Sequence, residues 1–198
     1  MSVTTNQRIA TMRYLVENYD EKEKRLGKTI LLKSMFVLQD LFEVPLDYSY
    51  QIYLYGPYSA GAVRDLEWAS YNDFLDMLVT RDRNYNNFYD LSIPDGERLN
   101  NPNLLKFKVE LTKVEQKENE DFLYEHKDKL ESFLKIFRGK ATREFELYST
   151  IVFLYNRKKD EFSIYDILSE VKEIKPHFDE EEIKTAYEYL KTSTHLFD

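Results

Sequence analysis

The sequence predicts an α+β protein that is mainly helical, with an N-terminal winged-helix-like module followed by a C-terminal helical bundle. In the first half, apolar residues at helical spacing give way to short alternating stretches, in the order helix, helix, strand, helix and hairpin. In the second half, amphipathic stretches follow one another with capping and turn residues between them. We therefore expect two modules, residues 1–116 and residues 117–198, with a boundary near 115–118.

The first two helices are expected near residues 5–19 and 29–42. Thr4 and Gln7 form a capping-box pattern immediately before the first apolar periodicity. The charged stretch between the two helices ends in Gly27 and is predicted to be a loop.

A strand with one buried face is predicted at 48–55, because its side chains alternate. The residues expected to face inward are Tyr48, Tyr50, Ile52 and Leu54. Gly56 supplies backbone freedom and Pro57 fixes its own φ angle, so these two residues are expected to turn the strand into the next helix. Ser59 is expected to cap that helix, near 60–73. We interpret Gly56, Pro57 and Ser59 as a structural hinge.

A hairpin is expected after the third helix. Strands near 75–82 and 88–93 flank a predicted turn at 84–87, and residues 105–111 alternate again between apolar and charged side chains. This order of elements (helix, helix, strand, helix and hairpin) is that of a winged helix. A strand between the second and third helices is the least common variation of that fold.

The C-terminal module is expected to hold four helices. The first two are predicted near 122–137 and 142–157, where apolar residues recur at helical spacing. The other two are each introduced by a capping pair, Ser163 with Asp166 and Asp179 with Glu182. Packing on the first module and dimerisation are both open as roles for this bundle.

Composition excludes several classes of protein. The chain has 198 residues, of which 42% are hydrophobic and 32% charged, so it is expected to fold. Its apolar runs are far shorter than the roughly 20 residues of a membrane span, and its first residues do not resemble a signal peptide. Cysteine is absent, which excludes disulfides and fits a reducing compartment. We expect a cytoplasmic protein that does not enter a membrane.

No catalytic, cofactor or metal site is predicted. The three histidines do not lie at metal-ligand spacing, and Gly56 and Ser59 are too far apart for a nucleophile elbow. The abundant carboxylate pairs are expected on solvated surface. We therefore expect a non-enzymatic protein, with an enzyme of unfamiliar type as the least favoured alternative.

The net charge of −8 argues against nonspecific coating of nucleic acid, but the charge is unevenly distributed. Residues 1–35 are net basic and residues 36–80 are net acidic. A nucleic-acid contact would need basic residues near the first loop, on the third helix or at the hairpin. The candidates are Lys22, Lys24, Arg25, Arg64, Arg81 and Arg83.

Tyrosine is concentrated around the predicted hinge. Five of the 16 tyrosines lie within residues 48–58. Tyrosine suits binding surfaces because it offers a large apolar body and a wet hydroxyl, although tyrosines also pack along ordinary strand faces. The candidate partner-binding residues are Tyr53 and Tyr55, opposite the expected inward face, and Tyr58 beside the turn.

Two long segments carry a family resemblance. Lys28–Leu41 (KTILLKSMFVLQDL) and Tyr50–Trp68 (YQIYLYGPYSAGAVRDLEW) resemble the YwgA-like family of small bacterial and archaeal proteins. The stretch that begins REFELYSTIVFLY at Arg143 resembles the helical tail of that family. Residues 83–103 fit the resemblance least and are interpreted as an insertion in the wing.

The Tyr-Gly-Pro core at Tyr55–Pro57 is shared more distantly with the phage-associated Panacea domain, which is found in many antitoxins. The resemblance implies toxin neutralisation or regulation through a protein partner. Two function classes follow. The favoured one is an antitoxin-like or phage-associated regulatory protein that binds a protein partner or a second copy of itself. The alternative is a winged-helix transcription regulator that binds DNA.

Overall fold

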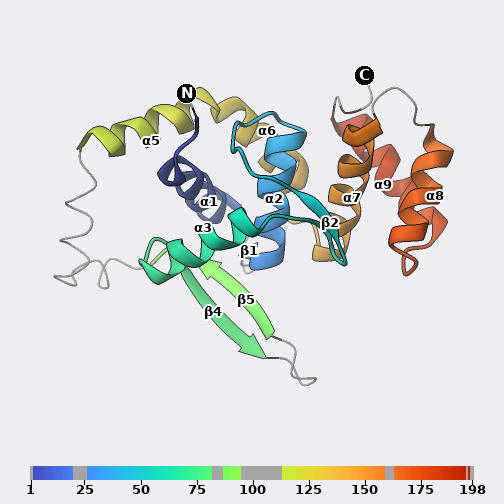
Figure 1. Cartoon of the computed structure of the whole chain (residues 1–198), viewed down its shortest axis with the longest axis horizontal. Helices are drawn as coiled ribbons and strands as arrows, with labels where there is room; N and C mark the ends of the chain where they lie inside the picture. The colour runs from blue at the N-terminus through green and yellow to red at the C-terminus, as the bar shows by residue number, and fades with distance from the viewer. Residues whose placement is uncertain are drawn as a thin grey trace.

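The computed structural model describes residues 2–19, 26–81, 87–94, 113–158, 163–194 and 196. These residues are mainly helical with small antiparallel sheets, which confirms the α+β class (Figure 1). The helices are α1 (Thr5–Tyr19), α2 (Lys28–Asp40), α3 (Ala60–Tyr71), α5 (Lys113–Glu125), α6 (Lys127–Phe137), α7 (Thr142–Lys158), α8 (Ile164–Ile174) and α9 (Glu180–Ser193). The strands are β1 (Leu26–Gly27), β2 (Gln51–Tyr53), β3 (Gly56–Tyr58), β4 (Asp76–Arg81) and β5 (Asn87–Ser92).

The described residues form two small sheets beside the helices. The first has the order β1-β5-β4, and both of its ladders are antiparallel. Its β4–β5 hairpin projects away from the helical body (Figure 1). Leu91 anchors the inner end of the hairpin in the core, whereas Leu78, Val79 and Phe88 are exposed. The second sheet is the β2–β3 hairpin between α2 and α3.

Local capping signals place several helix starts where the sequence predicts them. Thr4 and Gln7 exchange hydrogen bonds, with the Thr4 amide donating to Gln7 Oε1 at 2.9 Å. The pairs at the starts of α8 and α9 form complete capping boxes. At the start of α3, Ser59 Oγ accepts from the amide of Ala62. These contacts satisfy amides that the first helical turn leaves without a partner.

Both halves of the chain contribute to one continuous core. Helix α2 lies at its centre and packs against α7, so that Phe36 and Phe153 have ring centroids 6.1 Å apart. Helices α7, α8 and α9 gather at one end of the molecule, and α5 packs along α1 at the other (Figure 1). Helix α5 spans the proposed boundary at 116/117, and the division into two modules stays a prediction.

The stretch 122–137 forms two helices instead of the single predicted helix. The break lies at His126, whose φ and ψ of −104° and 12° are not helical. It allows α5 to follow α1 while α6 turns to bury Leu130, Phe133 and Phe137.

The segment around the predicted hinge is corrected in its geometry. Strand β2 covers only Gln51–Tyr53, a two-residue turn follows, and Gly56–Pro57 belongs to β3 rather than ending the strand region. Pro57 is tolerated because its sheet has only two strands, which gives it an edge position. Leu54, expected to face inward, lies in the turn and is 73% exposed. The predicted strand at 105–111 lies outside the described residues.

Candidate functional site

The β2–β3 hairpin displays the three tyrosines that the sequence singles out. Tyr53 and Tyr55 are 59% and 70% exposed, whereas Tyr48 is 7% exposed, so the cluster divides into a displayed group and a packed group. Tyr58 is also exposed, and its ring centroid lies 5.8 Å from that of Tyr53. Together with Leu54 at the turn, these side chains form what we call the tyrosine hairpin. It is an apolar, aromatic edge of the kind found at protein interfaces.

Gly56 is required at the base of this turn. Its φ is +98°, a region that residues with a Cβ atom rarely occupy. A Cβ atom here would lie 2.9 Å from Lys33 Nζ and 3.2 Å from Thr150 Oγ1. Glycine therefore lets the hairpin backbone approach both α2 and α7.

Two buried lysines donate hydrogen bonds to the backbone of the turn. The Lys33 ammonium on α2 donates to the carbonyl oxygen of Tyr55, and the Lys175 ammonium after α8 donates to the carbonyl oxygen of Leu54. Because one lysine comes from each half of the chain, the conformation of the hairpin depends on both halves.

Glu146 on α7 pairs with the deeper of the two lysines. Its Oε1 lies 2.8 Å from Lys175 Nζ, and the Lys175 side chain is fully buried. The same oxygen lies 3.5 Å from Nε2 of His177, which is half exposed. The ion pair offsets the cost of removing the Lys175 charge from water.

Lys33 has weaker compensation. Its residue is 4% exposed, and burial lowers the pKa of its ammonium to about 8, with the charge of Glu146 opposing that shift and the charge of Lys175 adding to it. Within the described part of the chain, no carboxylate lies within ion-pair distance of Lys33 Nζ. The carbonyl of Tyr55 is the acceptor recorded for it there.

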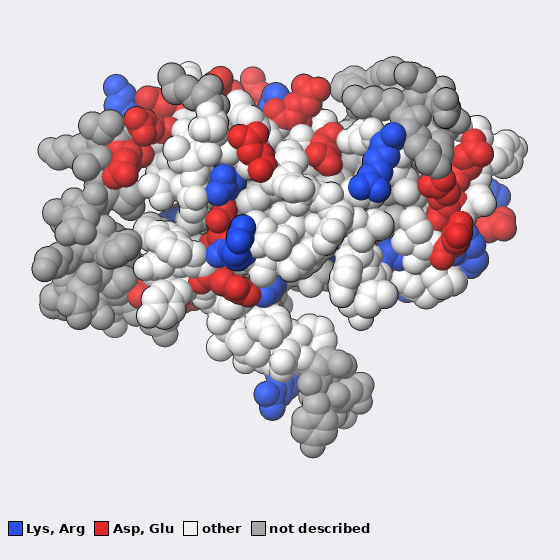
Figure 2. Space-filling view, in the orientation of Figure 1, with Lys and Arg blue, Asp and Glu red and all other residues white. Residues whose placement is uncertain are grey.

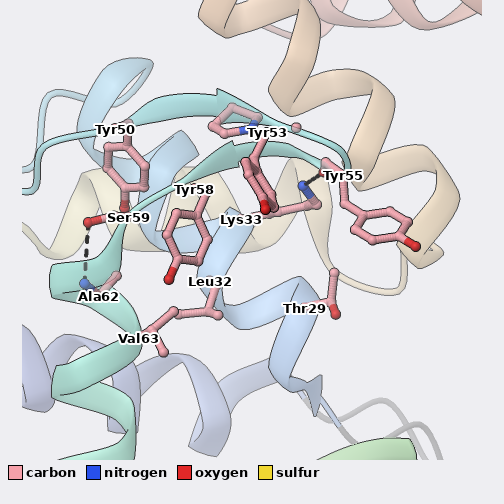
Figure 3. A pocket seen from close by; sticks show the side chains of 12 residues that line it. Thr29, Leu32, Lys33, Tyr50, Tyr53, Tyr55, Tyr58, Ser59, Ala62 and Val63 are labelled. Carbon is pink, nitrogen blue, oxygen red and sulfur yellow. Dashed lines mark hydrogen bonds between the residues drawn. The ribbon is translucent and has the colours of Figure 1, made fainter. Parts of the chain in front are cut away.

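A pocket of about 150 Å³ opens between the tyrosine hairpin, α2 and α3 (Figure 3). The rings of Tyr53 and Tyr58 and the side chains of Leu32 and Val63 surround it, and Lys33 lies beside Tyr53 (Figure 3). Apolar walls with a charged group among them are typical of small-ligand sites.

Tyr48 and Arg8 stabilise the fold through hydrogen bonds to Asp65. Tyr48 Oη donates to Asp65 Oδ2 at 2.8 Å, and Arg8 Nε donates to the same oxygen at 2.6 Å. This network joins α1, α3 and the segment that leads into β2. Burial and the neighbouring Asp65 carboxylate raise the pKa of Tyr48, so the hydroxyl stays protonated.

The candidate nucleic-acid residues do not form one surface in the part of the chain that the structure covers. Arg64 is exposed on α3 next to Glu67, which pairs with Lys28 at 3.7 Å. Arg81 lies at the outer end of β4 and donates to Asn87. Basic and acidic side chains are interspersed on the face in Figure 2. The remaining candidates lie outside the described residues: Lys22, Lys24, Arg25 and Arg83.

Among the residues with described positions, no cluster of histidine and carboxylate side chains is arranged to hold a metal ion, and no helix is long and apolar enough to cross a bilayer. No protein-family model matches the chain, and no curated protein matches its sequence. The resemblance to the YwgA-like family and the Panacea domain stays an expectation.

Sequence reasoning missed Lys33, Lys175 and Glu146. One signal was present for Lys33, since it stands in the mostly apolar run ILLKSMFVL at residues 30–38. A charged residue inside a mostly apolar helix segment indicates a specific partner. Lys175 and Glu146 carry no comparable local signal.

Proposed function

We propose that this chain is a non-enzymatic interaction protein that binds a protein partner through the tyrosine hairpin, in an antitoxin-like or phage-associated regulatory role. The observation that carries the proposal is the exposure of Tyr53, Leu54 and Tyr55 together at one turn. A monomeric protein rarely exposes adjacent large apolar side chains without a use for them. The resemblance to the Panacea domain, with its link to antitoxins, supports the regulatory role.

The hairpin is also held in a single shape, which favours tight binding. The carbonyl groups of Leu54 and Tyr55 accept from two buried ammonium groups, and Gly56 packs closely against α2 and α7. A rigid aromatic edge loses little conformational entropy when a partner covers it. Tyrosine has few rotatable bonds, which lowers that cost further.

Replacing Tyr53 and Tyr55 with serine is expected to lower affinity for the partner at least about tenfold, since aromatic hot spots each contribute on the order of 2 kcal/mol. The exposed rings contribute little to folding, so the melting temperature should barely change. The partner is identified by capture from the native host and mass spectrometry, and its affinity is then measured by calorimetry.

The matched control replaces Tyr124 and Tyr165 with serine. These tyrosines are 80% and 77% exposed but lie on α5 and α8, away from the hairpin. The control should bind like the unmodified protein. Equal loss of affinity in both double variants, or no loss in either, would contradict a role for the hairpin.

A DNA-binding transcription regulator is the second candidate, and the sheet topology favours it. The elements α1, β1, α2, α3, β4 and β5, with β1 paired to β5, follow the order and pairing expected of a winged helix, which supports this candidate, but the β2–β3 hairpin is an addition between α2 and α3. In that interpretation α3 would enter the major groove and the β4–β5 hairpin would be the wing. The exposed charges of α3 are opposed, however, because Glu67 accompanies Arg64.

Replacing Arg64 and Arg81 with alanine separates the two candidates. If the tyrosine hairpin is the functional surface, the unmodified protein should show no salt-dependent binding to duplex DNA in a gel-shift titration. The variant should still bind the protein partner. Binding to DNA that weakens with salt, with a shallower salt dependence in the variant, would favour the DNA regulator instead.

A further inference from the structure

We infer that the pocket beneath the tyrosine hairpin binds a small aromatic carboxylate, with its ring between Tyr53, Tyr58, Leu32 and Val63 and its carboxylate on the Lys33 ammonium. The pocket shares Tyr53 and Tyr58 with the tyrosine hairpin, but the inference does not depend on the proposed protein partner.

Lys33 lines the pocket and has no close counterion among the described residues. The charge of Glu146 acts on Lys33, but of the two buried lysines only Lys175 lies within ion-pair distance of that carboxylate. A buried charge without a close counterion is costly, and an anionic ligand would supply one. Burial lowers the pKa of Lys33, and the charge of Lys175 adds to that shift, as expected of an ammonium group without a close counterion.

The hydrogen-bonding capacity of Lys33 gives the same indication. An ammonium group has three N–H donors. The structure records one acceptor for Lys33 in its described part, the carbonyl oxygen of Tyr55. A carboxylate in the pocket would accept the remaining donors through strong, charge-assisted hydrogen bonds.

The size and walls of the pocket define the rest of the ligand. A volume of about 150 Å³ matches the engineered apolar cavity that holds one benzene molecule. The rings of Tyr53 and Tyr58 are tilted by 41° with centroids 5.8 Å apart, so they contact each other and form one aromatic wall against which a ligand ring can pack. A single aromatic ring that carries a carboxylate therefore fits the pocket in both size and charge.

The test is a calorimetric and NMR titration of the full chain with benzoate at neutral pH, and benzyl alcohol is the uncharged probe. We expect benzoate to bind at least about tenfold more tightly than benzyl alcohol, a difference of about 1.4 kcal/mol, because only benzoate forms a charge-assisted hydrogen bond with both partners ionised. Lys33→Met should remove that preference while leaving the weak binding of benzyl alcohol. Chemical-shift changes should centre on Tyr53, Tyr58 and Val63.

Lys28→Met is the matched control, since Lys28 lies on the same helix but pairs with Glu67 and does not line the pocket. It should bind benzoate like the unmodified protein. Absence of benzoate binding, equal binding of both probes to the unmodified protein, or unchanged benzoate affinity in Lys33→Met would each overturn the inference. None of these results would affect capture of a protein partner. The comparison of the two probes on the unmodified protein remains a valid test even if Lys33→Met does not fold.

Discussion

Replacing Gly56 with alanine is expected to destabilise the protein by about 3 kcal/mol, because a positive φ angle and a close approach to two helices combine at this position. The new methyl group would lie 2.9 Å from Lys33 Nζ and 3.3 Å from Ser149 Oγ. Either the Lys33 ammonium moves and loses its bond to Tyr55, or the hairpin lifts from α7. The measurement is thermal or urea unfolding, where a loss of this size lowers the melting temperature by roughly 6–12 °C.

Gly27→Ala is the matched control. Gly27 has an ordinary φ of −80°, and its added Cβ atom would lie 3.6 Å from the Tyr89 carbonyl oxygen, an ordinary contact. Because Gly27 precedes α2 as its N-cap, alanine should cost less than about 1 kcal/mol there. Equal destabilisation by the two substitutions would mean that Gly56 has no special role.

Features that depend on neighbours in the sequence could be predicted from it. The capping boxes of α8 and α9 and the cap of α3 by Ser59 join residues three apart, so their patterns are visible in the chain. The β4–β5 hairpin follows from two strand-like stretches on either side of the predicted turn at 84–87. The exposure of Tyr53 agrees with the alternation expected for the strand, whereas Tyr55 is exposed beside Leu54 in the turn that follows β2.

Features that depend on distant contacts could not be predicted. The contact of Lys175 with Leu54 joins residues 121 positions apart, and no local pattern in the sequence encodes it. The two-residue strand β1 is too short to show any periodicity. The position of the turn at Leu54 follows from the pairing of β2 with β3, since Tyr53 faces Gly56 across the ladder. A continuous strand through 48–55 would show the same alternation of side chains. Only the pairing with the partner strand distinguishes that strand from the observed short strand and turn.

The bonds from two buried lysines to the tyrosine hairpin explain why the two halves of the chain should behave as one unit in unfolding experiments. Lys33 on α2 and Lys175 after α8 both donate to the hairpin between α2 and α3, and Glu146 on α7 pairs with Lys175. Loosening the C-terminal helices would leave the carbonyl group of Leu54 without its donor. The display of the tyrosines therefore depends on the helical bundle as well as on the strands that carry them.

Replacing Glu146 with glutamine is expected to destabilise the protein by roughly 3 kcal/mol or more, because the fully buried Lys175 would keep its charge without a counterion. The measurement is urea unfolding at neutral pH. Glu131→Gln is the control, since Glu131 pairs with Lys127 on the surface of α6, where both side chains are more than half exposed. Loss of that surface pair should change the free energy of unfolding by less than about 0.5 kcal/mol.

The double variant Glu146→Gln with Lys175→Met decides whether the loss arises from the unpaired charge. If it does, removing Lys175 as well should recover part of the stability lost in the single variant, because an apolar side chain at a buried position needs no counterion. Incomplete recovery is expected, since the carbonyl group of Leu54 would lose its donor. A double variant that is less stable than Glu146→Gln alone would mean that the hydrogen bond from Lys175 to the tyrosine hairpin contributes more to stability than the pairing of the Lys175 charge. The main role of the buried Lys175 would then be to support the tyrosine hairpin.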